Sequence, residues 1–317
     1  MKVLITELMW EDGIEELKRK GYEVDYDKEL SRKRVELLKL LPGYDAVIVR
    51  NETKVDTEFL EAAKKARVIG RLGVGLDNIN LQEAREKNIP VISARNANAT
   101  SVAEYVMAAM LNASRRLEEA DADVRQGNWN RKFFTGYELN NRTLGLIGMG
   151  EIAHRVAKRA KAFGMNVIGY DPFVGPFDHV VQESGIHPVR KLEDLFKEAD
   201  FISIHVPLIK ATKHLINRNN FPLMKPEVYI INSSRGGIIH EDDLVVAVEK
   251  KLIAGAYLDV LEKEPVEKHS PLARVESIQL SPHIAGLTVE SQSRTAMLIS
   301  EEVDKILNGE QSICKVN

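Results

Sequence analysis

The stretch Thr143-Leu144-Gly145-Leu146-Ile147-Gly148-Met149-Gly150-Glu151-Ile152-Ala153 decides the fold. Its first five residues have strand character and run directly into Gly148 and Gly150, after which a helical pattern begins. In dinucleotide-binding folds the first glycine permits a tight turn and the second lets a pyrophosphate approach the backbone. The helix N-terminus then offers free N–H groups to the phosphates. Ala153 stands where a third glycine is usual, and a small residue is enough there for packing. The stretch therefore predicts a dinucleotide-binding unit.

An acidic residue ends the next predicted strand. Asp171 lies about 20 residues after Gly150, where a carboxylate accepts hydrogen bonds from the ribose 2′-OH of NAD and repels the extra phosphate of NADP. No arginine follows directly in Tyr170-Asp171-Pro172-Phe173, so we expect NAD as the cofactor. The alternative is that Asp171 is only a turn residue before proline. Glu151 fits less well, because a carboxylate beside the phosphates weakens anion binding modestly unless it points to solvent.

Strand-like runs alternate with helical patterns along most of the chain. This order predicts mostly parallel sheets with helices on both faces. The runs lie at residues 2–5, 46–49, 67–71, 90–93, 143–147, 166–170, 201–205, 229–232, 256–260 and 277–280, with helical patterns at 12–20, 57–65, 101–119, 153–163 and 241–250. We expect an α/β protein with two doubly wound parallel-sheet domains, the second a Rossmann domain. A last helix, near 289–307, should return to the first domain, giving boundaries of 1–98 plus 288–317 and 99–287.

Composition excludes several classes of protein. The 317 residues carry a net charge of −3 and a pI near 6.3, which excludes a broadly basic nucleic-acid binder. A single cysteine, Cys314, rules out a disulfide within the chain and a cysteine-based zinc site, and it fits a reducing cytoplasm. The eight histidines show no pair at ligand spacing on one helix, so we expect no metal. No apolar run approaches the ~20 residues that span a bilayer, and the start is too soon charged for a signal peptide.

Three polar residues follow predicted strands of the second domain by a few positions: Arg235, Glu264 and His283. That edge of an open α/β sheet binds ligands. A planar guanidinium binds a substrate carboxylate with two hydrogen bonds, and an imidazolium donates a proton near neutral pH. A carboxylate on that imidazole fixes its tautomer. The set suits hydride transfer to the carbonyl of a 2-oxo acid. The alternatives are an ordinary surface ion pair for the arginine and a capping or core role for the histidine.

At these residues the chain resembles the D-isomer-specific 2-hydroxyacid dehydrogenase family, and within it the short phosphoglycerate dehydrogenase-like branch. The likeness covers nearly the whole chain, including residues 71–79, 101–104, 170–172 and 203–208 beside the glycine loop and the three catalytic segments. It implies a cytoplasmic NAD-linked oxidoreductase, usually a homodimer, that interconverts a small D-2-hydroxy acid and its 2-oxo acid. Arg235, Glu264 and His283 would be its catalytic set. The regulatory domain of longer phosphoglycerate dehydrogenases is not expected.

The resemblance also implies the binding residues. Val74 and Gly75 would present backbone N–H groups to the substrate carboxylate, and Asp259 would hold the nicotinamide amide. The first domain and the last helix would form the substrate domain, whose closure shields hydride transfer from water. The implied cofactor-binding set is Gly148, Gly150, Glu151, Ile152, Asp171, His205, Val206, Pro207, Ser233, Ser234, Asp259 and Gly286.

The sequence indicates the substrate less specifically than the cofactor. Arg50-Asn51 and Arg95, by analogy with the family's first-domain loops, would face the distal end of the substrate. Extra positive charge there suits a phosphate or sulfonate at C3, and residues 49–51 and 101–106 also resemble sulfolactate dehydrogenases. If these arginines are instead solvated or bridge domains, hydroxypyruvate or glyoxylate becomes the expected substrate.

Two further alternatives stay open. Some proteins of this fold are NAD-binding corepressors or scaffolds with little turnover, and turnover of small 2-oxo acids distinguishes them from the enzyme. A formate dehydrogenase of the same fold pairs its histidine with glutamine, whereas Glu264 stands here.

Aromatic residues in the irregular stretch 126–142 pack either within the chain or against a second subunit.

Overall fold

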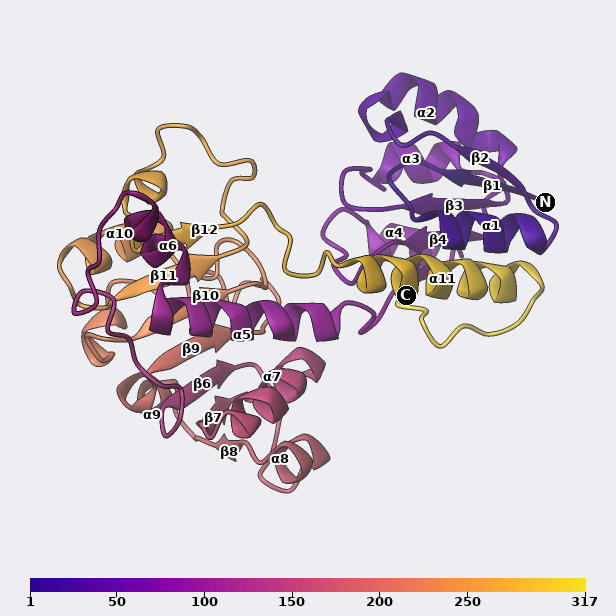
Figure 1. Ribbon diagram of the computed structural model, residues 1–317. Coiled ribbons are helices and arrows are strands. Elements are labelled where there is room, and N and C mark those ends of the chain that lie inside the picture. The colour runs from indigo at the N-terminus through magenta and orange to yellow at the C-terminus, as the bar shows by residue number, and fades with distance from the viewer. The chain divides into compact units, whose positions relative to one another are not determined.

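The computed structural model describes residues 1–317, which divide into two compact units (Figure 1). Unit 1 comprises Met1–Asn98 and Leu287–Asn317, and unit 2 comprises Ala99–Gly286. The second boundary differs from the expected one by a single residue. None of the helices combines the length and the apolar character that a membrane span requires.

Unit 1 contains a five-stranded parallel sheet in the order β2-β1-β3-β4-β5. The strands are β1 (Lys2–Ile5), β2 (Glu23–Tyr26), β3 (Ala46–Val49), β4 (Val68–Arg71) and β5 (Val91–Ser93). All four residues of β3 are buried, as expected for a central strand covered on both faces. The sequence analysis missed β2, because its residues Glu-Val-Asp-Tyr are largely exposed at the sheet edge and carry no apolar run.

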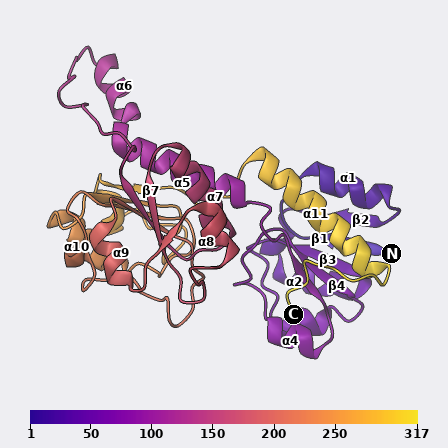
Figure 2. The ribbon, with the colours of Figure 1, turned by 90° about the horizontal axis from the view of Figure 1, so that it is seen from below.

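Helices cover both faces of this sheet. They are α1 (Glu11–Arg19), α2 (Arg34–Leu40), α3 (Thr57–Ala62), α4 (Leu81–Glu86) and α11 (Val289–Leu307), with 3-10 turns at Leu30–Arg32 and Leu41–Gly43. Figures 1 and 2 both show α11 alongside α1, so the last helix returns to unit 1. Ile14 and Leu17 of α1 share one core cluster with Ile299 and Val303 of α11.

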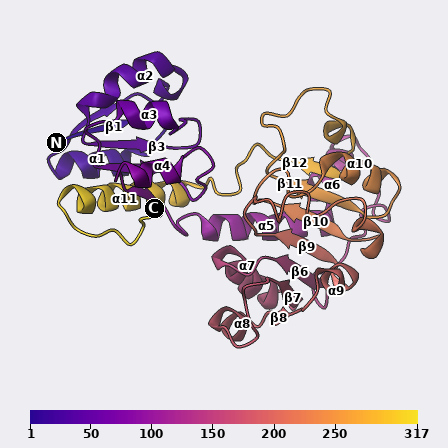
Figure 3. The same ribbon diagram turned by 180° about the vertical axis from the view of Figure 1, so that it is seen from behind.

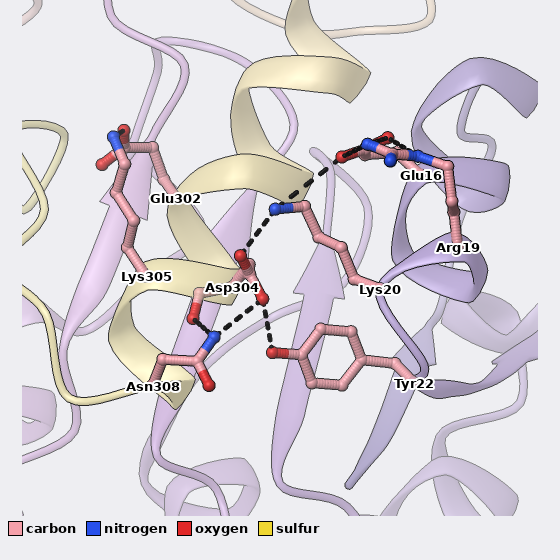
Figure 4. A network of polar contacts seen from close by, with 8 residues as sticks. All are labelled: Glu16, Arg19, Lys20, Tyr22, Glu302, Asp304, Lys305 and Asn308. Carbon is pink, nitrogen blue, oxygen red and sulfur yellow. Dashed lines mark hydrogen bonds and ion pairs between the residues drawn. The ribbon is translucent and has the colours of Figure 1, made fainter.

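A polar network also joins α11 to the N-terminal segment (Figure 4). Lys20 Nζ lies 2.6 Å from Asp304 Oδ2, and the Tyr22 hydroxyl donates to Asp304 Oδ1 at 2.7 Å. Burial, and then the bond to Asp304, raises the pKa of Tyr22 to about 12. Asn308 Nδ2 donates to the same carboxylate at 2.9 Å. These contacts fix the rotation of α11 against the first helix.

Unit 2 contains a seven-stranded parallel sheet in the order β12-β11-β10-β9-β6-β7-β8 (Figure 3). The strands are β6 (Thr143–Ile147), β7 (Asn166–Tyr170), β8 (His187–Pro188), β9 (Phe201–Ile204), β10 (Tyr229–Asn232), β11 (Gly255–Leu258) and β12 (Ile278–Leu280). β6 pairs with β7 on one side and β9 on the other, so the strand order reverses there. Doubly wound sheets bind ligands at this switch point.

The helices of unit 2 pack on opposite faces of its sheet. They are α5 (Ala99–Arg115), α6 (Leu117–Arg125), α7 (Glu151–Ala162), α8 (His179–Ser184), α9 (Leu192–Glu198) and α10 (Glu241–Glu249), with 3-10 turns at Phe221–Leu223 and Pro271–Arg274. Helices α5 and α7 share one core cluster, and α9 and α10 share another. The single helix expected over 101–119 is two helices, because Arg116 adopts a left-handed conformation (φ 42°).

Helix α6 and the residues after it extend away from the sheet of unit 2 (Figure 2). None of the α6 residues is buried. Phe133 and Phe134 contact each other edge to face at 4.9 Å, and the Arg116 guanidinium lies 4.6 Å from the Phe133 ring centre. Even so, Trp129 is 75% exposed and Phe133 61%, so local packing covers only part of this aromatic surface. We call residues 117–138 the arm.

Candidate active site

The glycine loop joins β6 to α7 as the sequence predicts. Gly148 has a φ of +90°, and an added Cβ would approach His205 O to 2.7 Å, so only glycine fits. Around Gly150, by contrast, a Cβ would meet nothing within 4 Å. No side chain caps α7 at Gly150, so protein groups do not use the first N–H donors of that helix. The loop therefore has the open cradle that a pyrophosphate needs.

Asp171 follows β7 and is fixed against this loop. Its Oδ2 accepts the Met149 N–H at 2.9 Å, and its Oδ1 accepts the Phe173 N–H at 2.9 Å. Because a carboxylate oxygen accepts more than one hydrogen bond, both oxygens keep capacity for ribose hydroxyls. The structure thus gives Asp171 a role in its turn and leaves acceptor capacity on both carboxylate oxygens.

The negative charge of Glu151, at the start of α7, is paired with an arginine of the same helix. Its Oε1 accepts from Arg155 Nε at 2.8 Å and lies 2.7 Å from Arg155 Nη2, one helical turn along α7. Arg155 Nη1 also donates to Thr100 Oγ1 at 2.9 Å. The neighbouring guanidinium offsets the repulsion that the sequence led us to expect between this carboxylate and the phosphates.

The residues after β9 lie beside Gly148. Ser203 Oγ and His205 Nε2 are 2.9 Å apart, and burial of the ring lowers the pKa of His205 to about 4. The ring is therefore neutral at physiological pH and contributes no charge toward phosphates. The Val206 side chain is one of the groups that an added Cβ at Gly148 would contact. Pro207 follows, and its carbonyl accepts the Thr212 hydroxyl at 2.5 Å.

The turn after β10 carries Ser233, Ser234 and Arg235. Asn232 shapes it: its Nδ2 donates to Arg235 O at 2.9 Å, and its Oδ1 accepts the Ser234 N–H at 3.1 Å and hydroxyl at 2.9 Å. The Ser233 hydroxyl is buried without a hydrogen-bond partner, which is costly unless a bound group supplies one. Arg235 is half-buried, and its Nη1 donates to Ser234 O at 2.6 Å.

Glu264 and His283 form the pair expected from the sequence. His283 Nδ1 lies 2.9 Å from Glu264 Oε2, and both side chains are about half exposed. Glu264 Oε1 accepts the Leu261 N–H at 3.0 Å, and the backbone of Leu261 packs directly on Gly236 beside Arg235. The three catalytic candidates therefore lie together at the carboxyl ends of the adjacent strands β10, β11 and β12. The contact with the carboxylate is made by Nδ1, and Nε2 takes no part in this pair.

Asp259, which the family resemblance assigns to the nicotinamide amide, is enclosed by the protein. Only 1% of it is exposed, and its carboxylate accepts the Ser281 hydroxyl at 2.6 Å, the Ile284 N–H at 2.8 Å and the Ala285 N–H at 2.7 Å. Its backbone oxygen accepts the His283 N–H at 2.9 Å. Asp259 thus binds the Ser281 hydroxyl before His283 and two backbone N–H groups after it, and the φ of His283 is +57°. This loop ends at Gly286, the last residue of unit 2.

Sequence reasoning missed two residues of this network. The Tyr105 hydroxyl of α5 lies 2.7 Å from Ser281 Oγ, and because Ser281 donates to Asp259, Tyr105 is the donor to Ser281. The only sequence signal for Ser281 is its position directly after a strand and two residues before His283. Nothing local indicates Tyr105, which is 176 positions away in the chain.

In unit 1 the expected substrate residues share one edge of the sheet. Arg50 and Asn51 follow β3, Val74 and Gly75 lie in the loop after β4, and Arg95 follows β5, and these three strands are neighbours. Arg50 is half-buried, and burial lowers the pKa of its guanidinium. Val74 is 41% exposed, and Arg95 is also exposed.

Comparison with known proteins identifies the family. Residues 107–285 match the sequence model for "D-isomer specific 2-hydroxyacid dehydrogenase, NAD binding domain". The chain belongs to this family. Over 317 residues it is 42% identical to D-3-phosphoglycerate dehydrogenase of Methanocaldococcus jannaschii, covering 100% of this chain and 59% of that protein. Over 305 residues it is 40% identical to (S)-sulfolactate dehydrogenase of Chromohalobacter salexigens, covering 96% and 98% of the two chains.

A solved structure supports the same assignment. The crystal structure of the TT0316 protein from Thermus thermophilus matches with a TM-score of 0.92 and 32% identity, covering 100% of both chains. The family, the two parallel-sheet domains and NAD as the cofactor of unit 2 are thereby confirmed. The chain spans 59% of the length of the archaeal phosphoglycerate dehydrogenase.

Proposed function

We propose that this protein is an NAD-dependent D-2-hydroxyacid dehydrogenase. The observation that carries the proposal is the hydrogen-bonded His283–Glu264 pair beside the Arg235 turn, at the same sheet edge as the glycine loop. A guanidinium, an acid-base imidazole and an orienting carboxylate are the groups that reduction of a 2-oxo acid requires. A corepressor or scaffold with little turnover is the alternative, and turnover of small 2-oxo acids distinguishes the two.

The residues present fit the cofactor. Gly148 and Gly150 leave a cradle for the pyrophosphate, Asp171 keeps acceptor capacity for the ribose, and the buried Ser233 hydroxyl lacks a protein partner. Val206, Pro207, Ser234 and Ile152 border these groups in the proposed cofactor site. When bound, NADH supplies the hydride that reduces the substrate carbonyl carbon.

The chain's own groups supply binding and the proton. Arg235 would bind the carboxylate of the 2-oxo acid, a task for which a bidentate guanidinium is suited. His283 would donate a proton from Nε2 to the carbonyl oxygen as the hydroxyl forms. Glu264, bonded to Nδ1, holds the ring in the tautomer and orientation that this transfer requires and stabilises the imidazolium before transfer. In the oxidation direction the same ring nitrogen accepts the proton.

We further propose that unit 1 is the substrate domain and that the preferred substrate carries an anionic group at C3. Arg50, Asn51, Val74, Gly75 and Arg95 lie on one edge of its sheet. Two relatives, by name, act on 3-phosphoglycerate and on sulfolactate, and both of these acids bear a second anion. A third relative is a hydroxypyruvate reductase of Thermotoga maritima, so an uncharged C3 hydroxyl is the competing substrate class.

A panel of 2-oxo acids tests both the dehydrogenase activity and the preference for an anionic group at C3. We expect NADH oxidation with phosphohydroxypyruvate or sulfopyruvate at a kcat/KM well above that with hydroxypyruvate, glyoxylate or pyruvate. An Arg50→Ala variant should abolish that preference while pyruvate kinetics stay unchanged. A preference for hydroxypyruvate or glyoxylate in the wild type would overturn the anionic subsite alone. Tight NADH binding with no turnover of any acid would overturn the enzyme and favour a binding role.

We also propose that the arm mediates a homodimer. Its apolar side chains stay largely exposed: Leu117 and Tyr137 are each 66% exposed, Trp129 75% and Phe133 61%. A second copy of the chain would bury them. Light scattering after gel filtration should give a dimer for the wild type and a monomer for a Trp129→Ser/Phe133→Ser double variant. A monomeric wild type at micromolar concentration contradicts the proposal.

A cytoplasmic location completes the proposal. The only cysteine, Cys314, is buried and free, which fits a reducing compartment. Fractionation of the native host with an antibody to the chain tests this location, and recovery from an extracellular fraction would contradict it.

A further inference from the structure

One buried carboxylate in unit 1 has no part in the proposed mechanism. Glu7 lies just after β1, is 4% exposed, and accepts four consecutive backbone N–H groups of the loop that follows β3. Its Oε1 accepts from Arg50 at 2.8 Å and from Thr53 at 2.9 Å, and its Oε2 accepts from Asn51 at 3.1 Å and from Glu52 at 2.9 Å. Residues 50–53, here called the Arg50 loop, are therefore organised around one side chain.

Consecutive backbone N–H groups that converge in this way form a concave anion-binding nest. In the Arg50 loop the nest is already filled, since an internal carboxylate engages all four donors. These N–H groups are therefore not available to a ligand. A substrate anion at the Arg50 loop must therefore be bound by side chains, and Arg50 is the cation that this loop carries.

The carbonyl side of the loop is also held. Asn78 Nδ2 donates to Arg50 O at 3.0 Å and to Thr53 O at 2.7 Å, and the Thr53 and Thr6 hydroxyls are 2.9 Å apart. The loop backbone is thus held on its N–H side by Glu7, after β1, and at two of its carbonyls by Asn78, in the loop after β4. Burial lowers the pKa of Arg50, and the negative charge of Glu7 opposes that shift, so the carboxylate supports the charged guanidinium.

We propose that Glu7 is the positioning residue for substrate recognition by Arg50: as an internal anion it fixes the Arg50 loop so that the guanidinium is presented to the substrate. The inference rests on the proposed function, since it assumes that Arg50 contacts the substrate. Glu7 itself touches neither substrate nor cofactor. Its loss should change substrate affinity more than the rate of the bound complex.

A Glu7→Gln variant tests this role. Glutamine keeps one acceptor oxygen and turns an NH2 group toward two N–H donors, so the loop loses half of its anchor. We expect the KM for the preferred 2-oxo acid to rise about tenfold or more, as for other misplaced binding groups. The kcat and the KM for NADH should stay within about twofold. In an Arg50→Ala background the same change should raise KM no further, because the two residues act as one unit.

A matched control is available at the other end of β3, the strand that the Arg50 loop follows. Asp45 precedes β3, is 7% exposed, and accepts the Lys2 N–H at 2.7 Å. Asp45→Asn removes a buried carboxylate from unit 1 without touching the Arg50 loop. It should lower thermal stability without raising the KM. If Asp45→Asn and Glu7→Gln raise the KM equally, the effect of Glu7 is general destabilisation and the inference is wrong.

A second pair of variants serves if Glu7→Gln folds poorly. Asn78→Ala loosens the same loop from its carbonyl side and should give the same selective rise in KM. Glu7→Ala deletes a group equivalent to acetate, so added acetate should raise its melting temperature but not that of the wild type. A folded Glu7→Gln or Asn78→Ala enzyme with an unchanged KM overturns the inference and leaves the proposed function intact. A wild type that turns over no 2-oxo acid overturns the proposed function, and the inference with it.

Discussion

Replacement of Asp259 by asparagine tests whether this carboxylate sets the geometry of His283. The wild-type side chain accepts three hydrogen bonds, from Ser281, Ile284 and Ala285, in a site with 1% exposure. Asparagine offers one acceptor oxygen in place of two, so at least one N–H group then faces an NH2 group and is left without a partner.

The structure sets the expected magnitude. Loss of a hydrogen bond to a charged acceptor costs about 1.5–3 kcal/mol, and a buried unsatisfied donor costs about 1–3 kcal/mol. We take about 3 kcal/mol as the combined effect, which for a unit of this size lowers the melting temperature by about 6–12 °C. Because His283 has a left-handed backbone that this network holds, we also expect kcat to fall about 100-fold.

The assay combines kinetics with local hydrogen exchange. Amide exchange in a peptide covering residues 281–286, measured without cofactor, should be much faster in the variant. Tyr105→Phe is the matched control, because it removes only the outer hydroxyl of the network at Ser281 and should lower kcat less than about threefold. Unchanged exchange and melting temperature with a lower kcat would refute the reasoning. Asp259 would then act on the nicotinamide, as the family resemblance implies, rather than on the loop.

Three other changes have defined outcomes. Arg235→Lys should lower kcat/KM about 10- to 100-fold in steady-state assays, because lysine cannot form the bidentate pair with a carboxylate; near-normal kinetics would remove Arg235 as the substrate anchor. NADH should be strongly preferred to NADPH, and Asp171→Ala should reduce the ratio of their kcat/KM values, whereas equal values in the wild type would remove Asp171 from the ribose site. His205, with a pKa near 4 when folded and 6.5 as its ordinary value, should destabilise the protein as pH falls from about 6.5 to 4, by up to about 3 kcal/mol. Denaturation at several pH values should show a smaller loss for His205→Asn than for the wild type, and equal losses would exclude His205 as the cause.

The sequence was sufficient where a feature is local. The glycine loop, Asp171 and most strands could be predicted because each depends on a run of neighbouring residues. The failures also have local causes. β8 is only two residues long, and β2 is a polar edge strand, so neither carries an apolar run. The break between α5 and α6 at Arg116 depends on a left-handed backbone conformation that an arginine does not predict.

From the sequence we could place Arg235, Glu264 and His283 after strands, but not the long-range contacts that surround the proposed site. The His283–Glu264 pair joins two loops and was inferred from chemistry, since the family motifs place both residues after strands. The ion pair between Glu151 and Arg155 could have been predicted, because Arg155 lies four positions along the same helix. Glu7 and the Arg50 loop are more than 40 residues apart, and Tyr105 and Ser281 are 176 apart. Only the assembled sheets bring these groups together.

The return of α11 to unit 1 determines the order in which the two units can fold during synthesis. Residues 99–286 contain every strand and helix of unit 2, so the whole of that unit is synthesised before α11. Residues 1–98 leave the ribosome before it, yet α1 and its sheet lack the helix that covers Ile14 and Leu17 until residues 289–307 emerge. At about 5–20 residues per second, the first 98 residues wait roughly 10–40 s with that apolar face uncovered. The unit that starts first therefore finishes last, and its exposed face is the one that a chaperone would meet on the nascent chain.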